Sequence, residues 1–224
     1  VVGIKYSGGF NRTIKATVEK NGDRYVYTVK NNKENFVPLQ MGPGEYKISV
    51  LEHVEGNTYK TLFSETVSIS NINTYNMYTY STLETYFTNS MKSIINYGTS
   101  VAGKPNNEKI ETVYKDVVSN YTYDYEKLSY LTGEYVPYID EMYNMKKGIC
   151  YDYASLMAGV LRSQGIATKL VKGFAPEVKE YHAWNEVFMD GKWYVVDTTY
   201  DSAMFQAGYN VSFSKDPSLF TVVR

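Results

Sequence analysis

Cys150 is the only cysteine in the chain, and its side chain is the one best able to take part in a reaction. It opens a run of apolar residues at helical spacing that stops before Gln164 and Gly165, where glycine favours a helix end. We therefore expect Cys150 in the first turn of a buried helix. The positive end of the helix dipole and the free backbone N–H groups favour a thiolate there, and the thiolate is the nucleophilic form of a thiol. A buried structural cysteine is the alternative.

A second pattern places a histidine beside a carboxylate. Two runs rich in aromatic and β-branched residues flank Asp190-Gly191, a dipeptide typical of two-residue hairpin turns. With two loop residues, Asp197 lies opposite Trp184, and His182 is its diagonal neighbour on the same face of the sheet. A loop of odd length would move His182 and Asp197 to opposite faces.

Together these three side chains have the chemistry of a thiol nucleophile system. The His182 imidazole would accept the thiol proton of Cys150, and the Asp197 carboxylate would fix the imidazole tautomer and stabilise its cation. The same residue types can bind zinc, but zinc ligands usually include closely spaced pairs, which are missing here. We therefore expect no metal at this site.

The sequence around these residues resembles the core of the transglutaminase-like superfamily. The resemblance covers roughly residues 114–201 and rests on Gly148–Leu156, Leu161–Ala167, His182–Val187 and Trp193–Thr199. It implies an α+β, papain-like fold with a helix packed on an antiparallel sheet, in which Cys150 is the nucleophile, His182 the base and Asp197 the orienting acid. This chain has Asp197-Thr198-Thr199 where Asp-Pro-Thr is commoner, which removes a backbone constraint but no catalytic group.

The resemblance also suggests further site residues. The Cys150 backbone N–H is a natural donor to a developing oxyanion. Papain-like sites commonly add an upstream side-chain donor, and the aligned candidate is the stretch Tyr121–Tyr125, with no single member favoured. The candidate substrate-binding residues are Tyr123 and Tyr125, together with Trp184, which is expected to shield the site from water.

Alternation of apolar residues indicates a separate all-β part at the N-terminus. Ile14, Ala16 and Val18 alternate with polar residues before a turn at Asn21-Gly22, and a similar pattern resumes at Tyr25. We predict a small immunoglobulin-like β-sandwich over residues 1–75, acting as a spacer or docking domain, and a transglutaminase-like catalytic domain over residues 76–224. Within the latter, a helix is expected to begin near Ser81-Thr82, and residues 121–131 and 135–145 are expected to be long loops.

The amino-acid composition of the chain excludes several classes of binding partner and cross-link. The net charge of −1 offers no general attraction to nucleic acid, and no apolar run is long enough for membrane insertion. One cysteine excludes an intramolecular disulfide, and the proposed chemistry requires no cofactor. The first residue is Val1 rather than Met, which is compatible with removal of an export signal; with the β-sandwich and the aromatic, polar composition it favours an extracellular or cell-surface location.

The sequence predicts thiol-dependent acyl transfer or hydrolysis at a carboxamide or peptide bond of a protein or peptide substrate, through a thioester. It leaves transamidation, deamidation and proteolysis open, as well as the oligomeric state. The alternative is a catalytically silent transglutaminase-like module that binds a cell-surface or peptide ligand. The 24 tyrosines and the added β-domain favour that alternative, whereas the intact triad argues against it.

Overall fold

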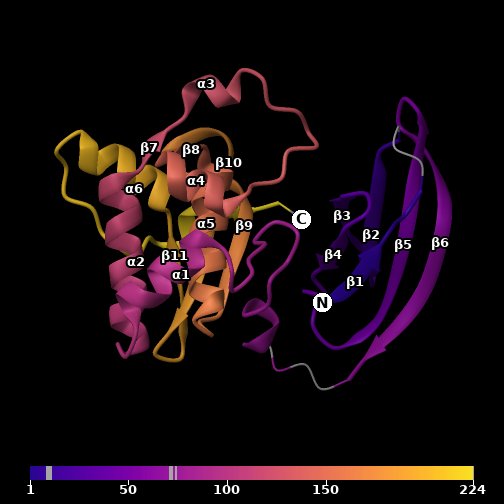
Figure 1. Ribbon diagram of the computed structural model, residues 1–224, viewed down its shortest axis with the longest axis horizontal. Coiled ribbons are helices and arrows are strands. Elements are labelled where there is room, and N and C mark those ends of the chain that lie inside the picture. The colour runs from indigo at the N-terminus through magenta and orange to yellow at the C-terminus, as the bar shows by residue number, and fades with distance from the viewer. Residues whose placement is uncertain (9–11, 71–72, 74, 224) are drawn as a thin grey trace. The chain divides into compact units, whose positions relative to one another are not determined.

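The computed structural model describes residues 1–8, 12–70, 73 and 75–223. The described chain forms two compact units, Val1–Met77 and Tyr78–Val223 (Figure 1). Residues 71, 72 and 74, which belong to the region where the sequence suggests a domain boundary, lie outside the described residues.

The N-terminal unit is built from two antiparallel sheets. One has four strands in the order β3-β2-β5-β6, and the other pairs β1 with β4. The strands are β1 (Val2–Lys5), β2 (Ile14–Lys20), β3 (Asp23–Val29), β4 (Glu34–Val37), β5 (Gly44–Glu55) and β6 (Thr58–Ile69). The prediction of a small all-β sandwich is confirmed, and its likeness to an immunoglobulin domain stays a prediction.

The alternation in β2 explains how this unit folds. Ile14, Ala16 and Val18 are at most 2% exposed and lie on one face of the strand. The turn to β3 uses Asn21 and Gly22, with φ angles of 52° and 91°, which asparagine and glycine tolerate best. The short strands β1 and β4 carry too little alternation to be recognised from sequence.

The C-terminal unit is mixed α+β, as predicted. Its main sheet has the order β11-β10-β9-β12, and a small parallel sheet pairs β7 with β8 (Figure 1). The strands are β7 (Thr122–Tyr123), β8 (Lys147–Gly148), β9 (Thr168–Ala175), β10 (Val178–Met189), β11 (Lys192–Val196) and β12 (Thr221–Val222). The helices are α1 (Lys92–Val101), α2 (Asn106–Asn120), α3 (Tyr125–Leu128), α4 (Ile139–Met145), α5 (Cys150–Ser163) and α6 (Thr198–Gln206), with short 3₁₀ turns η1 (Asn76–Tyr78) and η2 (Pro217–Leu219).

Helix α5 is the centre of this unit. Leu156, Met157 and Val160 are fully buried, and each such side chain contributes about 1.5–3 kcal/mol through removal from water. The helix packs on the sheet, where the Asn185 side chain of β10 donates to the Ala154 carbonyl oxygen at 2.9 Å. This is the helix-on-sheet arrangement that the resemblance implies.

Two expectations about elements are wrong. The helix expected near Ser81-Thr82 begins only at Lys92, because the Asp140 carboxylate accepts the N–H groups of Lys92 and Ser93 at 2.8 and 2.7 Å and so caps α1 from a distant part of the chain. The loop expected over residues 135–145 contains α4, and the one expected over residues 121–131 contains β7 and α3.

Candidate active site

Cys150 is the first residue of α5, as the sequence predicts. The preceding backbone N–H, that of Ile149, donates to the Asp152 carboxylate at 2.9 Å, which fixes the entry into the helix. The helix ends before Gly165, whose φ of 74° is typical of a helix C-terminus. The thiol therefore lies at the positive end of a buried helix dipole.

The hairpin of β10 and β11 has the register that the sequence predicts. Asp190 and Gly191 form the two-residue turn, with φ angles of 51° and 81°, and Met189 pairs with Lys192. Asn185 pairs with Val196, so the register carries Asp197 to the position beside His182.

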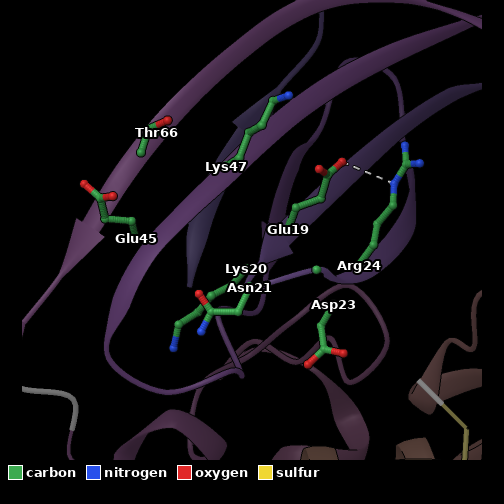
Figure 2. A pocket seen from close by; sticks show the side chains of 9 residues that line it. Glu19, Lys20, Asn21, Asp23, Arg24, Glu45, Lys47 and Thr66 are labelled. Carbon is green, nitrogen blue, oxygen red and sulfur yellow. Dashed lines mark ion pairs between the residues drawn. The ribbon is translucent and has the colours of Figure 1, made fainter.

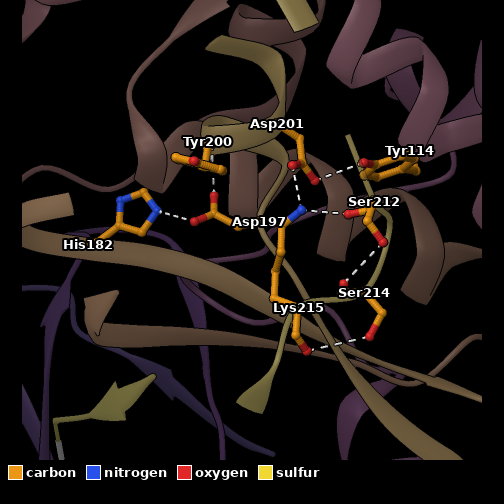
Figure 3. A network of polar contacts seen from close by, with 8 residues as sticks. All are labelled: Tyr114, His182, Asp197, Tyr200, Asp201, Ser212, Ser214 and Lys215. Atoms are coloured by element: carbon orange, nitrogen blue, oxygen red, sulfur yellow. Dashed lines mark hydrogen bonds and ion pairs between the residues drawn. The ribbon is translucent and has the colours of Figure 1, made fainter. Parts of the chain in front are cut away.

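His182 and Asp197 form a buried hydrogen bond. The His182 Nε2 atom lies 2.8 Å from Asp197 Oδ2, and the two side chains are only 4% and 2% exposed (Figure 3). The other Asp197 oxygen accepts the Tyr200 backbone N–H at 3.0 Å and caps α6. Both carboxylate oxygens are thus held, which fixes the orientation of the imidazole.

The surroundings of His182 favour the protonated, positively charged form of its imidazole. Burial alone lowers the pKa of His182, but hydrogen bonds to Asp197 and Cys150 and their negative charges raise it to about 10. Because Nε2 is engaged by Asp197, Nδ1 is the ring nitrogen left for the thiol. At neutral pH the raised pKa therefore keeps the His182 imidazole protonated beside Cys150.

Trp184 packs against the imidazole. Its ring is stacked with that of His182, with centroids 6.4 Å apart and 21° between the planes, and it is tilted on Phe220 at 5.0 Å. Trp184 is 1% exposed and belongs to a small apolar cluster with Val171 and Val195. It therefore offers little open surface to a substrate, and direct substrate contact stays a prediction.

Tyr123 lies beside the nucleophile. It ends β7, which pairs with β8 at Gly148, two residues before Cys150. Burial and the nearby Cys150 raise the pKa of Tyr123 above its usual range, and its hydroxyl is within hydrogen-bonding reach of the Cys150 backbone. Tyr125 is 76% exposed, and its ring centroid is 4.8 Å from that of Tyr123. Tyr123 is thus close to the candidate nucleophile, and Tyr125 contacts the Tyr123 ring.

Sequence reasoning missed a polar network next to Asp197. Asp201 is fully buried and accepts the Tyr114 hydroxyl at 2.8 Å and the Lys215 ammonium at 2.5 Å (Figure 3). Burial raises the pKa of Asp201 although both hydrogen bonds oppose this rise. The spacing of four residues from Asp197 along a helix was the available signal for Asp201, whereas nothing in the sequence points to Lys215.

The described residues include no candidate metal site and no candidate membrane-spanning helix. No group of three or more His, Cys, Asp or Glu side chains there is arranged to hold a metal ion. None of the described helices is long and apolar enough to cross a membrane.

A separate hollow of about 400 Å³ lies in the N-terminal unit (Figure 2). Its walls carry charges of both signs, with an ion pair of 3.3 Å between Arg24 and Glu19. The side chains that line it are Glu19, Lys20, Asn21, Asp23, Arg24, Glu45, Lys47 and Thr66. It contains no residue of the candidate triad.

The sequence comparison agrees with the resemblance. Residues 93–198, which include Cys150, His182 and Asp197, match the family model of the transglutaminase-like superfamily. Part of the chain is also similar to UPF0252 protein MJ1282 of Methanocaldococcus jannaschii, at 29% identity over 105 residues. That match covers 42% of this chain and only 30% of the relative.

Two solved structures show a weak overall similarity to this chain. One, from Cytophaga hutchinsonii, is described provisionally as a cysteine protease; it has 11% identity and a TM-score of 0.46, over 88% of this chain and 73% of that chain. Another is the periplasmic domain of TgpA from Pseudomonas aeruginosa bound to ethylmercury, with 16% identity and a TM-score of 0.43 over 91% of each chain. These TM-scores, both below 0.5, are too low to transfer a function to this chain.

Proposed function

We propose that this protein is a thiol-dependent acyltransferase or hydrolase that acts on a carboxamide or peptide bond of protein or peptide substrates. The observation that carries the proposal is the position of His182, buried between the Asp197 carboxylate and the thiol of Cys150 at the start of α5. The match to a transglutaminase-like core supports the same class of chemistry.

In the first step, the Cys150 thiolate attacks the carbonyl carbon of the substrate. A carbon–sulfur bond forms, and the carbonyl π electrons move to the oxygen, which becomes an oxyanion. The Cys150 backbone N–H is the first donor to this oxyanion, and the Tyr123 hydroxyl is the side-chain donor that lies within reach of that backbone. These two groups stabilise charge that develops only on the way to the transition state.

His182 then acts as the general acid. Its imidazolium gives a proton to the departing nitrogen, the carbon–nitrogen bond breaks, and a thioester to Cys150 remains. Water or a substrate amine next gives a proton to His182 and attacks the thioester, which releases the product and restores the thiolate. Asp197 keeps the imidazole oriented through both steps.

The acceptor decides which reaction results. Water gives deamidation of a carboxamide or cleavage of a peptide bond, and an amine gives transamidation. The proposal includes a spacer or docking role for the N-terminal β-sandwich and an extracellular or cell-surface location.

A second candidate function is binding without catalysis. Several tyrosines of the C-terminal unit are strongly exposed, which suits recognition of a peptide or sugar. Examples are Tyr125 at 76%, Tyr130 at 66% and Tyr181 at 53% exposure. In this alternative, ligand affinity would not depend on the thiol.

Turnover with peptide mixtures tests the proposal. The protein is incubated with glutamine-containing peptides, with and without a primary amine, and mass changes and ammonia release are measured. We expect product from the parent and from Lys192→Ala, a control on the exposed hairpin, and none from Cys150→Ala or His182→Ala. Equal turnover by all four proteins would refute the proposal, and tight binding unaffected by Cys150→Ala, without turnover, would support the binding module.

A further inference from the structure

Lys215 contacts the chain on both sides of Asp197. Its backbone N–H donates to the Val195 carbonyl oxygen at 2.9 Å, and its ammonium donates to Asp201 Oδ1 at 2.5 Å. Val195 lies two residues before Asp197 in β11, and Asp201 lies one helical turn after it in α6. Lys215 therefore connects the strand and the helix that meet at Asp197 (Figure 3).

The Asp201 end of this connection is buried. The side chain of Asp201 is 1% exposed and that of Lys215 is 17% exposed. The second Asp201 oxygen accepts the Tyr114 hydroxyl, and the Lys215 ammonium also donates to the Ser212 carbonyl oxygen at 2.5 Å. Loss of one partner would leave a buried charge unpaired, which is strongly unfavourable, so the arrangement is well defined.

We propose that Lys215 and Asp201 are positioning residues for the reaction: they clamp β11 to α6 and thereby hold the Asp197 carboxylate in register with His182. The inference rests on the proposed function, because it assigns these two residues a part in the same reaction. Neither residue touches the substrate in this account.

The charges in the network support this role. The ionisable groups that face Asp201 are Lys215, Tyr114 and Asp197. Without the Lys215 ammonium, the buried Asp201 carboxylate would lose its own cation while still lying near the Asp197 carboxylate. Either their repulsion or the loosening of α6 would then disturb the hydrogen bond between Asp197 and His182.

The test compares the alkylation of Cys150 by iodoacetamide at about pH 6 and about pH 9.5, below and above an ordinary thiol pKa of about 8.5. In Lys215→Met the rate near pH 6 should fall about tenfold, because a shift of about one pKa unit changes the thiolate fraction tenfold. The rate near pH 9.5 should stay close to that of the parent. Lys215→Arg should restore the rate near pH 6.

Lys169→Met is the matched control. It removes a half-buried ion pair of 2.6 Å between Lys169 and Glu186 in the same sheet, away from the junction at Asp197. Lys169→Met should leave unchanged the ratio between the alkylation rates of Cys150 near pH 6 and near pH 9.5. Asp201→Asn tests the clamp from the side of α6. It should slow the alkylation of Cys150 near pH 6 as Lys215→Met does, and it provides a second test if Lys215→Met folds poorly.

The outcomes separate the two hypotheses. A parent whose alkylation follows an ordinary thiol pKa would contradict the proposed function itself. The clamp alone would be overturned by a different result. In that case the parent is alkylated fast near pH 6, and Lys215→Met and Asp201→Asn unfold at lower temperature but keep the parent's ratio of the two alkylation rates.

Discussion

At the scale of single residues, the charge of His182 governs the reactivity of Cys150. The pKa of His182 rises from its ordinary 6.5 to about 10, since the hydrogen bonds to Asp197 and Cys150 outweigh the effect of burial. A folded-state pKa above the unfolded one means that folding favours the protonated form. This contribution to stability is complete below about pH 6.5 and is lost as the pH rises towards 10.

The unfolding free energy of His182→Gln should therefore approach that of the parent as the pH rises. We expect the largest difference near pH 6.5 and the smallest near pH 10. Urea unfolding followed by tryptophan fluorescence measures it, because both tryptophans, Trp184 and Trp193, belong to the C-terminal unit. His53→Gln, in the N-terminal unit, is the control; a difference for His182→Gln that is constant over this range would contradict the account.

Tyr123 gives a second prediction at this scale. Tyr123→Phe removes the hydroxyl near the Cys150 backbone, and the loss of one oxyanion donor costs about 100-fold in kcat. KM should change little, because the interaction forms mainly in the transition state. Tyr125→Phe, on the exposed neighbouring ring, is the control. Equal kcat values for the two variants would exclude Tyr123 as a donor.

The sequence was sufficient to place His182 beside Asp197 because a two-residue turn determines the pairing of every residue in the hairpin. It was not sufficient for Lys215, whose partner Asp201 precedes it by 14 residues and belongs to another element. Side-chain contacts between elements depend on tertiary packing, and no local pattern records them.

At the scale of elements, α5 presents the nucleophile, and Asp152 anchors its first turn. The Asp152 carboxylate accepts the Ile149 N–H, pairs with the Lys127 ammonium at 3.0 Å and accepts the Tyr135 hydroxyl. Lys127 and Tyr135 belong to the segment between β7 and α4, so Asp152 attaches this segment to the start of α5. Asp152 thus caps the start of α5.

Asp152→Ala should lower the unfolding free energy by about 3 kcal/mol, because it leaves the buried Lys127 ammonium without its nearest partner. Denaturant unfolding measures this change. Glu111→Ala breaks an exposed pair with Lys115 on α2 and should cost no more than about 0.5 kcal/mol. Similar losses for both variants would show that Asp152 contributes no more to stability than an exposed carboxylate does.

Elements with a strong local pattern were predictable, and elements that depend on distant partners were not. Helix α5 has apolar residues at regular spacing and a terminal glycine, and both of its ends agree with the sequence. Helix α1 starts where Asp140 caps it, 48 residues away from Lys92. Helix α4 has only seven residues, and they are a mixture of apolar, polar and aromatic types. This is too short and too mixed to show the helical spacing of apolar residues.

At the scale of the whole molecule, the candidate chemistry belongs to one unit. Cys150, His182 and Asp197 all lie within Tyr78–Val223, and the N-terminal sheets contribute none of them. Alternation was enough to predict an all-β part at the N-terminus, and the resemblance to the transglutaminase-like superfamily implied the α+β part that follows it. They gave no information on the partner of the N-terminal unit, because recognition depends on surface side chains rather than on periodicity.

The most direct test of the central claim is the rate of Cys150 alkylation by iodoacetamide as a function of pH, in the parent and in His182→Ala. The single cysteine makes the signal unambiguous. We expect fast alkylation well below the ordinary thiol pKa of about 8.5 in the parent, and much slower alkylation at the same pH in His182→Ala. A rate that rises only near that pKa and is the same in both proteins would contradict an activated Cys150–His182 pair.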